Sequence, residues 1–418
     1  MTEFLGYRCS LCRAEYPPVE VFYTCPKDGG NLDVILDSAQ IRQRYEPADI
    51  TSRTDASLWR YLPLLPVGDP EFEDSPLTAV GWTPVYRPVR LAQELNVRQL
   101  WIKDESRNPT ASFKDRASAL LVARAREIRA DTIVTASTGN AGAALAGMAA
   151  AAGMRAVIFA PRTAPPAKVA QLLVYGAQVI LVDGSYDQAF DLTVQAAREF
   201  GWYCRNTGYN PFTAEGKKTA AFEIWENVIL NQLGADETLT VFVSVGDGNI
   251  ISGIHKGFKD LLELGWLERM PRLVGVQAEG SAAVFNAFAA GRDYIEPVHS
   301  ETIADSISVD LPRDGVRAVR AATQTGGAYL KVSDQQILDA IRDLGKVGVF
   351  AEPAGATAYA GYLDALHSGL VDEDDPVLVL NTGNGLKDVR AAMRSVPEAP
   401  VIEPGFDALV RYLDSKKG

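Results

Sequence analysis

The chain has 418 residues, of which 47% are hydrophobic and 22% charged, so it is too long for one simple core and we expect two or three domains. Its formal net charge of −12 argues against nucleic-acid binding, which needs clustered lysine and arginine. No apolar run approaches the ~20 residues of a membrane span, and MTEFLGYRCS lacks the apolar centre of a secretory signal, so we expect a cytoplasmic protein without membrane partners.

Residues 1–35 carry three of the four cysteines, spaced C-x2-C-x12-C. In a reducing compartment this spacing indicates metal binding rather than disulfides. The pattern predicts a small zinc-ribbon-like module in which Cys9, Cys12 and Cys25 are ligands and Asp28 takes the place of a fourth cysteine. Structural zinc sites usually consist of Cys and His alone, so a hairpin that has lost its metal stays open as an alternative.

After a proline-rich stretch over residues 36–95, apolar runs alternate with alanine-rich helical segments. Alternation of this kind predicts an α/β fold with parallel sheets covered on both faces. We expect a large domain over residues 36–129 and 213–418, and a small mobile domain over 130–212. The predicted strands lie at residues 99–105, 132–137, 155–161, 178–184, 238–246, 272–280, 346–350 and 375–385.

Four glycine- or hydroxyl-rich stretches follow predicted strands: TASTGNAG, SVGDGNIISG, AEPAGATA and NTGNGLKD. In open α/β sheets, ligands bind beyond the carboxyl ends of the strands. The four stretches therefore predict one site with several walls.

SVGDGNIISG combines a glycine turn at Gly246 and Gly248 with a helix expected to begin near Asn249 or Ile250. Free N–H groups and the positive end of a helix favour a phosphate, although Asp247 would repel one unless it faces away. A plain turn before a helix is the alternative. The spacing is neither a dinucleotide fingerprint nor a P-loop.

ASTGNAG offers the hydroxyls of Ser137 and Thr138 and the amide of Asn140 at a helix start, a set that suits a carboxylate. A simple helix N-cap by Ser137 or Thr138 is the alternative. Thr382 in NTGNGLKD stands at a strand end, where a turn with two glycines would look the same.

The three histidines lie in no hydrolase or metalloprotease motif. A phosphate pocket and a carboxylate pocket without such groups suggest that a cofactor performs the chemistry. Lys114 in NPTASFKDRA is then either a solvated lysine at a helix start or the amine that holds this cofactor.

Together, NPTASFKDRA, ASTGNAGAA, VGDGN, EPAGA and TGNGLKD resemble the fold-type II (tryptophan synthase β-like) pyridoxal-phosphate enzymes, and most of all the threonine synthases, over residues 75–395. The resemblance implies pyridoxal 5'-phosphate held by Lys114 as a Schiff base, an amino-acid substrate and a homodimer. The implied cofactor-binding residues are Phe113, Lys114, Asn140, Gly246, Asp247, Gly248, Asn249 and Thr382. The implied substrate-binding residues are Ser137, Thr138, Gly139 and Asn206.

The chain departs from the family at positions that bear on the substrate. Thr213 replaces an arginine expected to bind the substrate's phosphate, and losing it should cost a few kcal/mol unless another cation substitutes. Candidate substitutes are Arg205, Lys217 and Lys218. Ala111 replaces a glycine.

Three functions stay open. The first is a threonine synthase acting on O-phosphohomoserine, and the second a related enzyme of elimination or replacement on an unphosphorylated amino acid, such as a serine/threonine dehydratase or a diaminopropionate ammonia-lyase. The third is a non-catalytic binding protein with the same fold.

Overall fold

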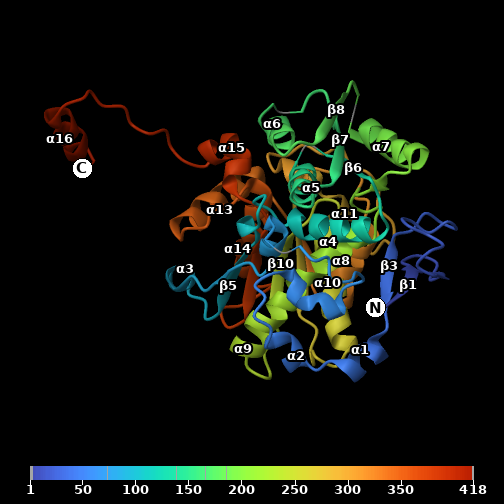
Figure 1. Cartoon of the computed structure of the whole chain (residues 1–418). Helices are drawn as coiled ribbons and strands as arrows, with labels where there is room; N and C mark the ends of the chain where they lie inside the picture. The colour runs from blue at the N-terminus through green and yellow to red at the C-terminus, as the bar shows by residue number, and fades with distance from the viewer. Residues whose placement is uncertain (1–2, 73, 138, 165, 185, 417–418) are drawn as a thin grey trace.

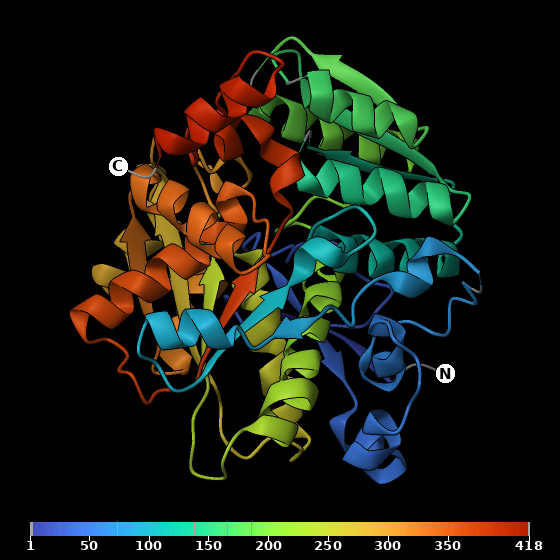
Figure 2. The ribbon, with the colours of Figure 1, turned by 90° about the vertical axis from the view of Figure 1, so that its left-hand side faces the viewer.

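The structure is a computed structural model that describes residues 3–72, 74–137, 139–164, 166–184 and 186–416. It contains three sheets with helices around them (Figures 1 and 2). The N-terminal sheet is antiparallel, in the order β2-β1-β3. Its strands are Glu15–Tyr16, Phe4–Cys9 and Leu32–Leu36.

The largest sheet has six strands in the order β12-β11-β10-β13-β5-β4. Every neighbouring pair is parallel except β4 with β5, which is antiparallel, so the expected parallel sheet is a mixed one. The strands are Ala328–Val332, Arg272–Ala278, Thr240–Ser244, Val377–Asn381, Leu100–Asp104 and Val85–Tyr86.

A second parallel sheet has four strands in the order β8-β7-β6-β9. They are Gln178–Val182, Arg155–Pro161, Thr132–Ala136 and Tyr203–Cys204. All four strands fall between residues 130 and 212, the segment expected to form a smaller domain. The mobility of that segment stays a prediction.

Alternate side chains of the central strands enter two different cores. Val241 and Val243 of β10 pack on the face covered by α8 and α10, whereas Phe242 packs on the face covered by α13 and α14. Strands buried on both faces are nearly all apolar, which explains the apolar run at the centre of β10. These helices are Phe212–Ile224, Asn249–Glu263, Asp334–Lys346 and Pro353–Ser368.

The smaller sheet is covered in the same way, by α4 and α5 on one face and α7 on the other. These helices are Lys114–Glu127, Asn140–Ala151 and Tyr186–Phe200. The other α-helices are α1 Ser38–Arg44, α2 Pro47–Thr51, α3 Val89–Glu94, α6 Pro166–Val174, α9 Leu230–Gln232, α11 Ala283–Ala289, α12 Gly315–Gln324, α15 Val389–Arg394 and α16 Phe406–Asp414. Helix α16 stands apart from the body of the molecule (Figure 1).

Short helical turns connect several of these elements. The 3₁₀ turns are η1 Leu58–Leu64, η2 Pro76–Ala79, η3 Glu105–Arg107, η5 Glu279–Ser281, η6 Asp305–Ile307 and η7 Gly385–Asp388. A π-helical turn, η4 Trp225–Ile229, follows α8.

The prediction of a strand over residues 346–350 is wrong. Lys346 ends α13, and the chain turns at Gly348, whose φ is +83°, before α14 begins at Pro353. Val349 is buried although it lies in a connection between two helices. A short apolar run cannot distinguish such a buried connection from a strand.

Candidate active site

A cavity of about 940 Å³ lies where the carboxyl ends of both parallel sheets meet, within the size range of small-molecule sites. Its lining includes the ends of β6 and β10, the turn at residues 246–248, the start of α4 and the segment 299–313. Two of the four predicted stretches, those after β6 and β10, line this cavity. The other two contribute to a smaller pocket that shares Gly139 and Asn140 with it.

Lys114 is the first residue of α4 and lines this cavity. The turn before it is fixed by the loop after β13: the N–H of Phe113 donates to the carbonyl of Thr382 (2.9 Å), and the N–H of Asn384 donates to the carbonyl of Ala111 (3.1 Å). Burial lowers the pKa of the Lys114 ammonium; the charges of Asp247 and Glu352 oppose that fall and Arg205 adds to it. A larger share of Lys114 is then the neutral, nucleophilic amine.

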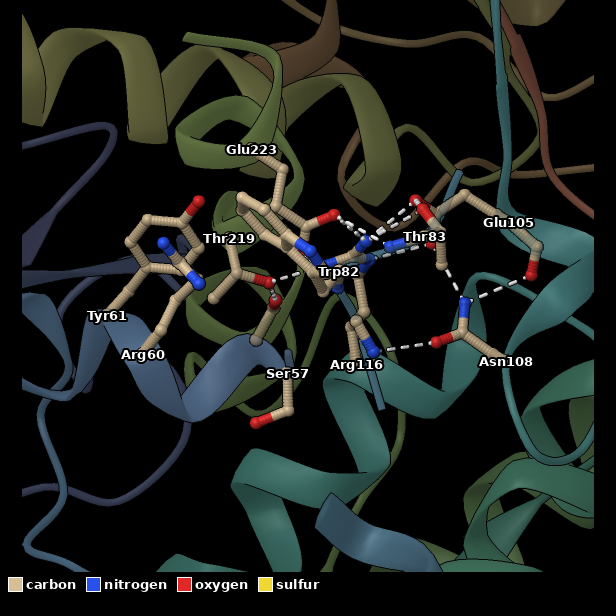
Figure 3. A network of polar contacts seen from close by, with 12 residues as sticks. Ser57, Arg60, Tyr61, Trp82, Thr83, Glu105, Asn108, Arg116, Thr219 and Glu223 are labelled. Atoms are coloured by element: carbon tan, nitrogen blue, oxygen red, sulfur yellow. Dashed lines mark hydrogen bonds and ion pairs between the residues drawn. The ribbon is translucent and has the colours of Figure 1, made fainter. Parts of the chain in front are cut away.

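A buried ion-pair network holds the helix that carries Lys114 (Figure 3). The guanidinium of Arg116 donates to Glu105 (2.7 and 2.8 Å) and to Glu223 (2.5 and 2.7 Å). Lys103 donates to Glu223 (2.6 Å) and to Thr83 (2.8 Å). The four charged side chains have no exposed area, so this network fixes the position of the first turn of α4.

Ala111, three residues before Lys114, has a φ of +64°. A residue with a Cβ costs roughly 1–2 kcal/mol in this left-handed region. This conformation would suit the glycine that the family resemblance leads us to expect here, and it makes Ala111 a strained residue beside the site.

The turn at residues 246–248 needs both of its glycines. A Cβ on Gly246 would lie 2.8 Å from the Cα of Ile307, and one on Gly248, whose φ is +92°, would lie 2.8 Å from the carbonyl of Asp314. Helix α10 begins at Asn249, as predicted. Asp247 lines the cavity and accepts the N–H of Asn249 (3.0 Å).

A buried lysine lies beneath this turn. Lys217 has no exposed side chain and donates to the Asn249 side-chain oxygen (2.5 Å). Burial holds the pKa of Lys217 well below its ordinary value; the charge of Asp247 opposes the fall and that of Lys114 adds to it. An anion at the start of α10 would therefore meet a helix N-terminus and a lysine that its charge would help to protonate.

The loop after β6 lines the opposite wall through Ser137, Gly139 and Asn140; Thr138 lies outside the described residues. Helix α5 has Gly139 as its N-cap, without a capping side chain, so the N-cap alternative is wrong for Ser137. The amide of Asn140 donates to Glu352 (2.6 Å). Burial raises the pKa of the Glu352 carboxyl to about 7, against the opposing effects of Lys387 and Lys114 and the Asn140 hydrogen bond.

Three predicted residues lie behind the cavity wall. Asn206 uses its side-chain oxygen to accept the N–H of Ala136 (2.8 Å) and the hydroxyl of Thr135 (3.0 Å), which fixes the end of β6. Thr382 and Phe113 are buried at the base of α4, where their backbones pair.

The cations considered as substitutes for the missing phosphate-binding arginine lie in different environments. Lys218 is paired with Asp260 (2.9 Å) and Glu215 (2.5 Å). Arg205 lines the cavity and donates to Thr207 (2.6 Å). Sequence reasoning missed Arg313, which lines the same cavity with its guanidinium 5.1 Å from the Phe190 ring centroid.

Comparison with known proteins agrees with this arrangement. The family model described as "Pyridoxal-phosphate dependent enzyme" matches residues 77–383. A threonine synthase of Methanocaldococcus jannaschii is 37% identical over 97% of this chain and 98% of its own length. The chain belongs to the threonine synthase family of pyridoxal-phosphate dependent enzymes.

Other relatives carry the same name. The threonine synthase of Methanosarcina acetivorans is 36% identical, over 96% of this chain and 97% of its own length. That of Mycobacterium tuberculosis is 35% identical, over 84% of this chain and 94% of its own. The matches to the proteins of Methanocaldococcus jannaschii and Methanosarcina acetivorans cover nearly the whole of both sequences.

Solved structures show the same fold at lower identity. Threonine deaminase isoform 2 of Solanum lycopersicum has a TM-score of 0.64 and 21% identity, over 86% of this chain and 89% of its own. Maize serine racemase has a TM-score of 0.60 and 23% identity, over 80% and 94%. The chain thus has the α/β fold of the fold-type II enzymes. No helix in the described ranges is both long and apolar enough to cross a membrane.

Proposed function

We propose that this enzyme is a threonine synthase that converts O-phosphohomoserine and water to threonine and phosphate. The observation that carries the proposal is the likeness to threonine synthases along almost the whole chain. The site supports the proposal, because three groups line one cavity: the amine of Lys114, the turn before α10 and the cation Arg205.

The residues present fit pyridoxal 5'-phosphate. The amine of Lys114 would hold its aldehyde carbon covalently, and the turn from Gly246 to Asn249 would bind its phosphate with the charge of Lys217 beneath. Asn140 would supply the amide for a ring oxygen, and Thr382 the hydroxyl for the ring nitrogen. A neutral hydroxyl leaves a moderate electron sink, which suits elimination and replacement at β and γ carbons.

Different walls of the cavity would bind the α-carboxylate and the phosphate of the substrate. Ser137, Thr138 and Gly139 supply donors for the α-carboxylate, with Asn206 holding the strand end behind them. Arg205 is the cation that we assign to the substrate's phosphate in place of the arginine absent at Thr213, because Lys218 is paired with acids elsewhere.

The reaction breaks the Cγ–O bond to phosphate and adds the oxygen of water at Cβ. When bound, pyridoxal phosphate supplies the electron sink that acidifies the carbon next to the amine. Lys114 would carry protons between neighbouring carbons of the substrate. Closure of the segment 130–212 onto the larger domain (36–129 and 213–418) would exclude water until the step in which water adds at Cβ.

The test is a product assay on protein loaded with cofactor and supplied with O-phosphohomoserine, with homoserine and serine as matched unphosphorylated substrates. Equal amounts of phosphate and threonine are expected, with no product from the other two. Ammonia and a keto acid from serine, without phosphate release, would instead support the second candidate, which Thr213 favours: an eliminating enzyme that acts on an unphosphorylated amino acid.

We also propose that the N-terminal module binds zinc through Cys9, Cys12, Cys25 and Asp28. Their donor atoms all lie within 4.8 Å of one another. The Cys12 and Cys25 sulfurs are 3.7 Å apart, close to the roughly 3.8 Å edge of a tetrahedron with 2.3 Å Zn–S bonds. Elemental analysis should find one zinc per chain, lost in Cys25→Ser and kept in the control Cys204→Ala; zinc-free wild-type protein would overturn this proposal.

Two further properties belong to the proposal. An exposed apolar stripe of Leu386, Val389 and Met393 supports a homodimer, which light scattering would test. None of Cys9, Cys12, Cys25 and Cys204 is in a disulfide, which supports a reducing, cytoplasmic location.

A further inference from the structure

The N-terminal module touches both parts of the protein that form the cavity. On one side, the N–H of Cys204 donates to the Tyr23 hydroxyl (3.0 Å), and the Tyr23 ring stacks on Tyr209 with centroids 4.6 Å apart. On the other side, Arg317 of α12 donates to the module's Asp33 (2.7 Å) and to the carbonyl of Leu32 (3.3 Å). The module therefore contacts both of these parts of the protein and connects them.

Arg317 links the module to Asp314. Its Nε and Nη2 donate to the two carboxylate oxygens of Asp314 (2.5 and 2.9 Å), while its Nη1 reaches Asp33. Asp314 has no exposed area and Arg317 has 9%. A two-pronged bond of this kind sets the orientation of a carboxylate as well as its charge.

Asp314 in turn holds the turn assigned to the cofactor's phosphate. Its Oδ2 accepts the side-chain N–H of Asn249 (2.7 Å), and its N–H donates to the carbonyl of Asp247 (2.9 Å). Its carbonyl packs under Gly248. Asn249 is also the acceptor for Lys217. The carboxylate of Asp314 thus holds Asn249, the acceptor for Lys217, while its backbone holds Asp247 and lies against Gly248.

We propose that the module sets the cofactor-phosphate turn through Asp33, Arg317 and Asp314, so that Arg317 is a positioning residue for pyridoxal phosphate. This inference rests on the proposed assignment of residues 246–249 to that phosphate. In these contacts the module reaches the turn at residues 246–249 through Arg317 and Asp314, and Arg320 of the same helix also donates to the carbonyl of the module's Ser10. Weakening the Asp33 end lets Arg317 and Asp314 shift, and the N–H groups at the start of α10 lose their alignment.

The test is the affinity of cofactor-free protein for pyridoxal phosphate, followed by visible absorbance, in wild type and Asp33→Asn. Pyridoxal, which lacks the phosphate, is titrated in parallel. We expect the dissociation constant for pyridoxal phosphate to rise about 2- to 30-fold in the variant, with that for pyridoxal unchanged. The control is Glu15→Gln, which removes an exposed ion pair with Arg8 on the same module and should change neither constant.

A second variant, Arg317→Lys, keeps the charge but cannot form the fork, and should show the same selective loss if Asp33→Asn proves poorly folded. Unchanged affinity for pyridoxal phosphate in both variants would overturn the proposal. An equal loss for pyridoxal would also overturn it, because a general structural defect does not distinguish the two ligands. If wild-type protein binds no pyridoxal phosphate, it is the proposed function that fails.

Discussion

Replacing Arg116 by methionine tests whether the buried network positions the lysine-bearing helix. The change removes four charge-assisted hydrogen bonds, at 2.5–2.8 Å, to Glu105 and Glu223. Lys103 alone would then face two buried carboxylates. Removing one partner of a buried ionic group costs about 3–5 kcal/mol, so we expect Arg116→Met to lower the free energy of unfolding by that amount, measured as a shift of the urea midpoint.

The loss of stability in Arg116→Met should also depend on pH. Desolvation raises the pKa of Glu223, but Arg116 and Lys103 outweigh it and hold the pKa at about 2. In wild type, Glu223 therefore adds stability above its unfolded pKa of roughly 4.3, which is lost as the pH falls toward 2. Without Arg116 the folded-state pKa rises, so the variant's deficit should be smaller at pH 5 than at pH 8.

Two further variants make the result interpretable. Arg90→Met removes an exposed pair with Glu94, whose side chains are 65% and 53% exposed, and should cost less than about 0.5 kcal/mol. The double change Arg116→Met with Glu223→Gln should recover part of the loss, because it removes an uncompensated charge. A cost for Arg116→Met below about 1 kcal/mol, or one independent of pH, would refute the reasoning.

Three other predictions follow from single residues. Arg205→Gln should raise KM for O-phosphohomoserine about 10- to 150-fold, the value of a charged hydrogen bond, without weakening cofactor binding; an unchanged KM would remove Arg205 from the phosphate site. Ala111→Gly should raise the free energy of unfolding by about 0.5–1 kcal/mol, since relief of the positive φ outweighs the added freedom of the unfolded chain; a lower urea midpoint would contradict this. Because the folded-state pKa of Glu352 is about 7, the cofactor-free protein binds more protons than the unfolded chain between roughly pH 4.3 and 7. Its stability should fall by up to about 3 kcal/mol as the pH rises through that window, and Glu352→Gln should lack this fall.

Local sequence patterns predict the fold well where burial on both faces restricts a segment to one kind of secondary structure. Strands β10, β11 and β13 are mostly apolar because both faces of the sheet are covered, and their positions follow from the sequence alone. Residues 346–350 have a similar composition but connect two helices, since the chain turns at Gly348. Strand β12 was missed because it is a short edge strand whose apolar pattern is interrupted by the exposed Lys331.

The residues of the site likewise include some that the sequence predicts and others that only the structure reveals. Lys114, Asn140 and the turn at Gly246 are visible in the sequence because short motifs contain them. The partners of Arg116 lie 11 and 107 residues away, and Arg317 reaches Asp33 across 284 residues. No local pattern encodes these pairings, so the groups that position the site emerge only from the fold.

The central claim is that Lys114 holds the cofactor, and one measurement tests it directly. Purified protein loaded with pyridoxal phosphate would be reduced with borohydride, digested, and mapped by mass spectrometry. We predict the reduced cofactor on the peptide that contains Lys114, and its absence from that peptide in Lys114→Ala. A cofactor attached to another lysine, or to none in wild-type protein that binds it, would contradict the account.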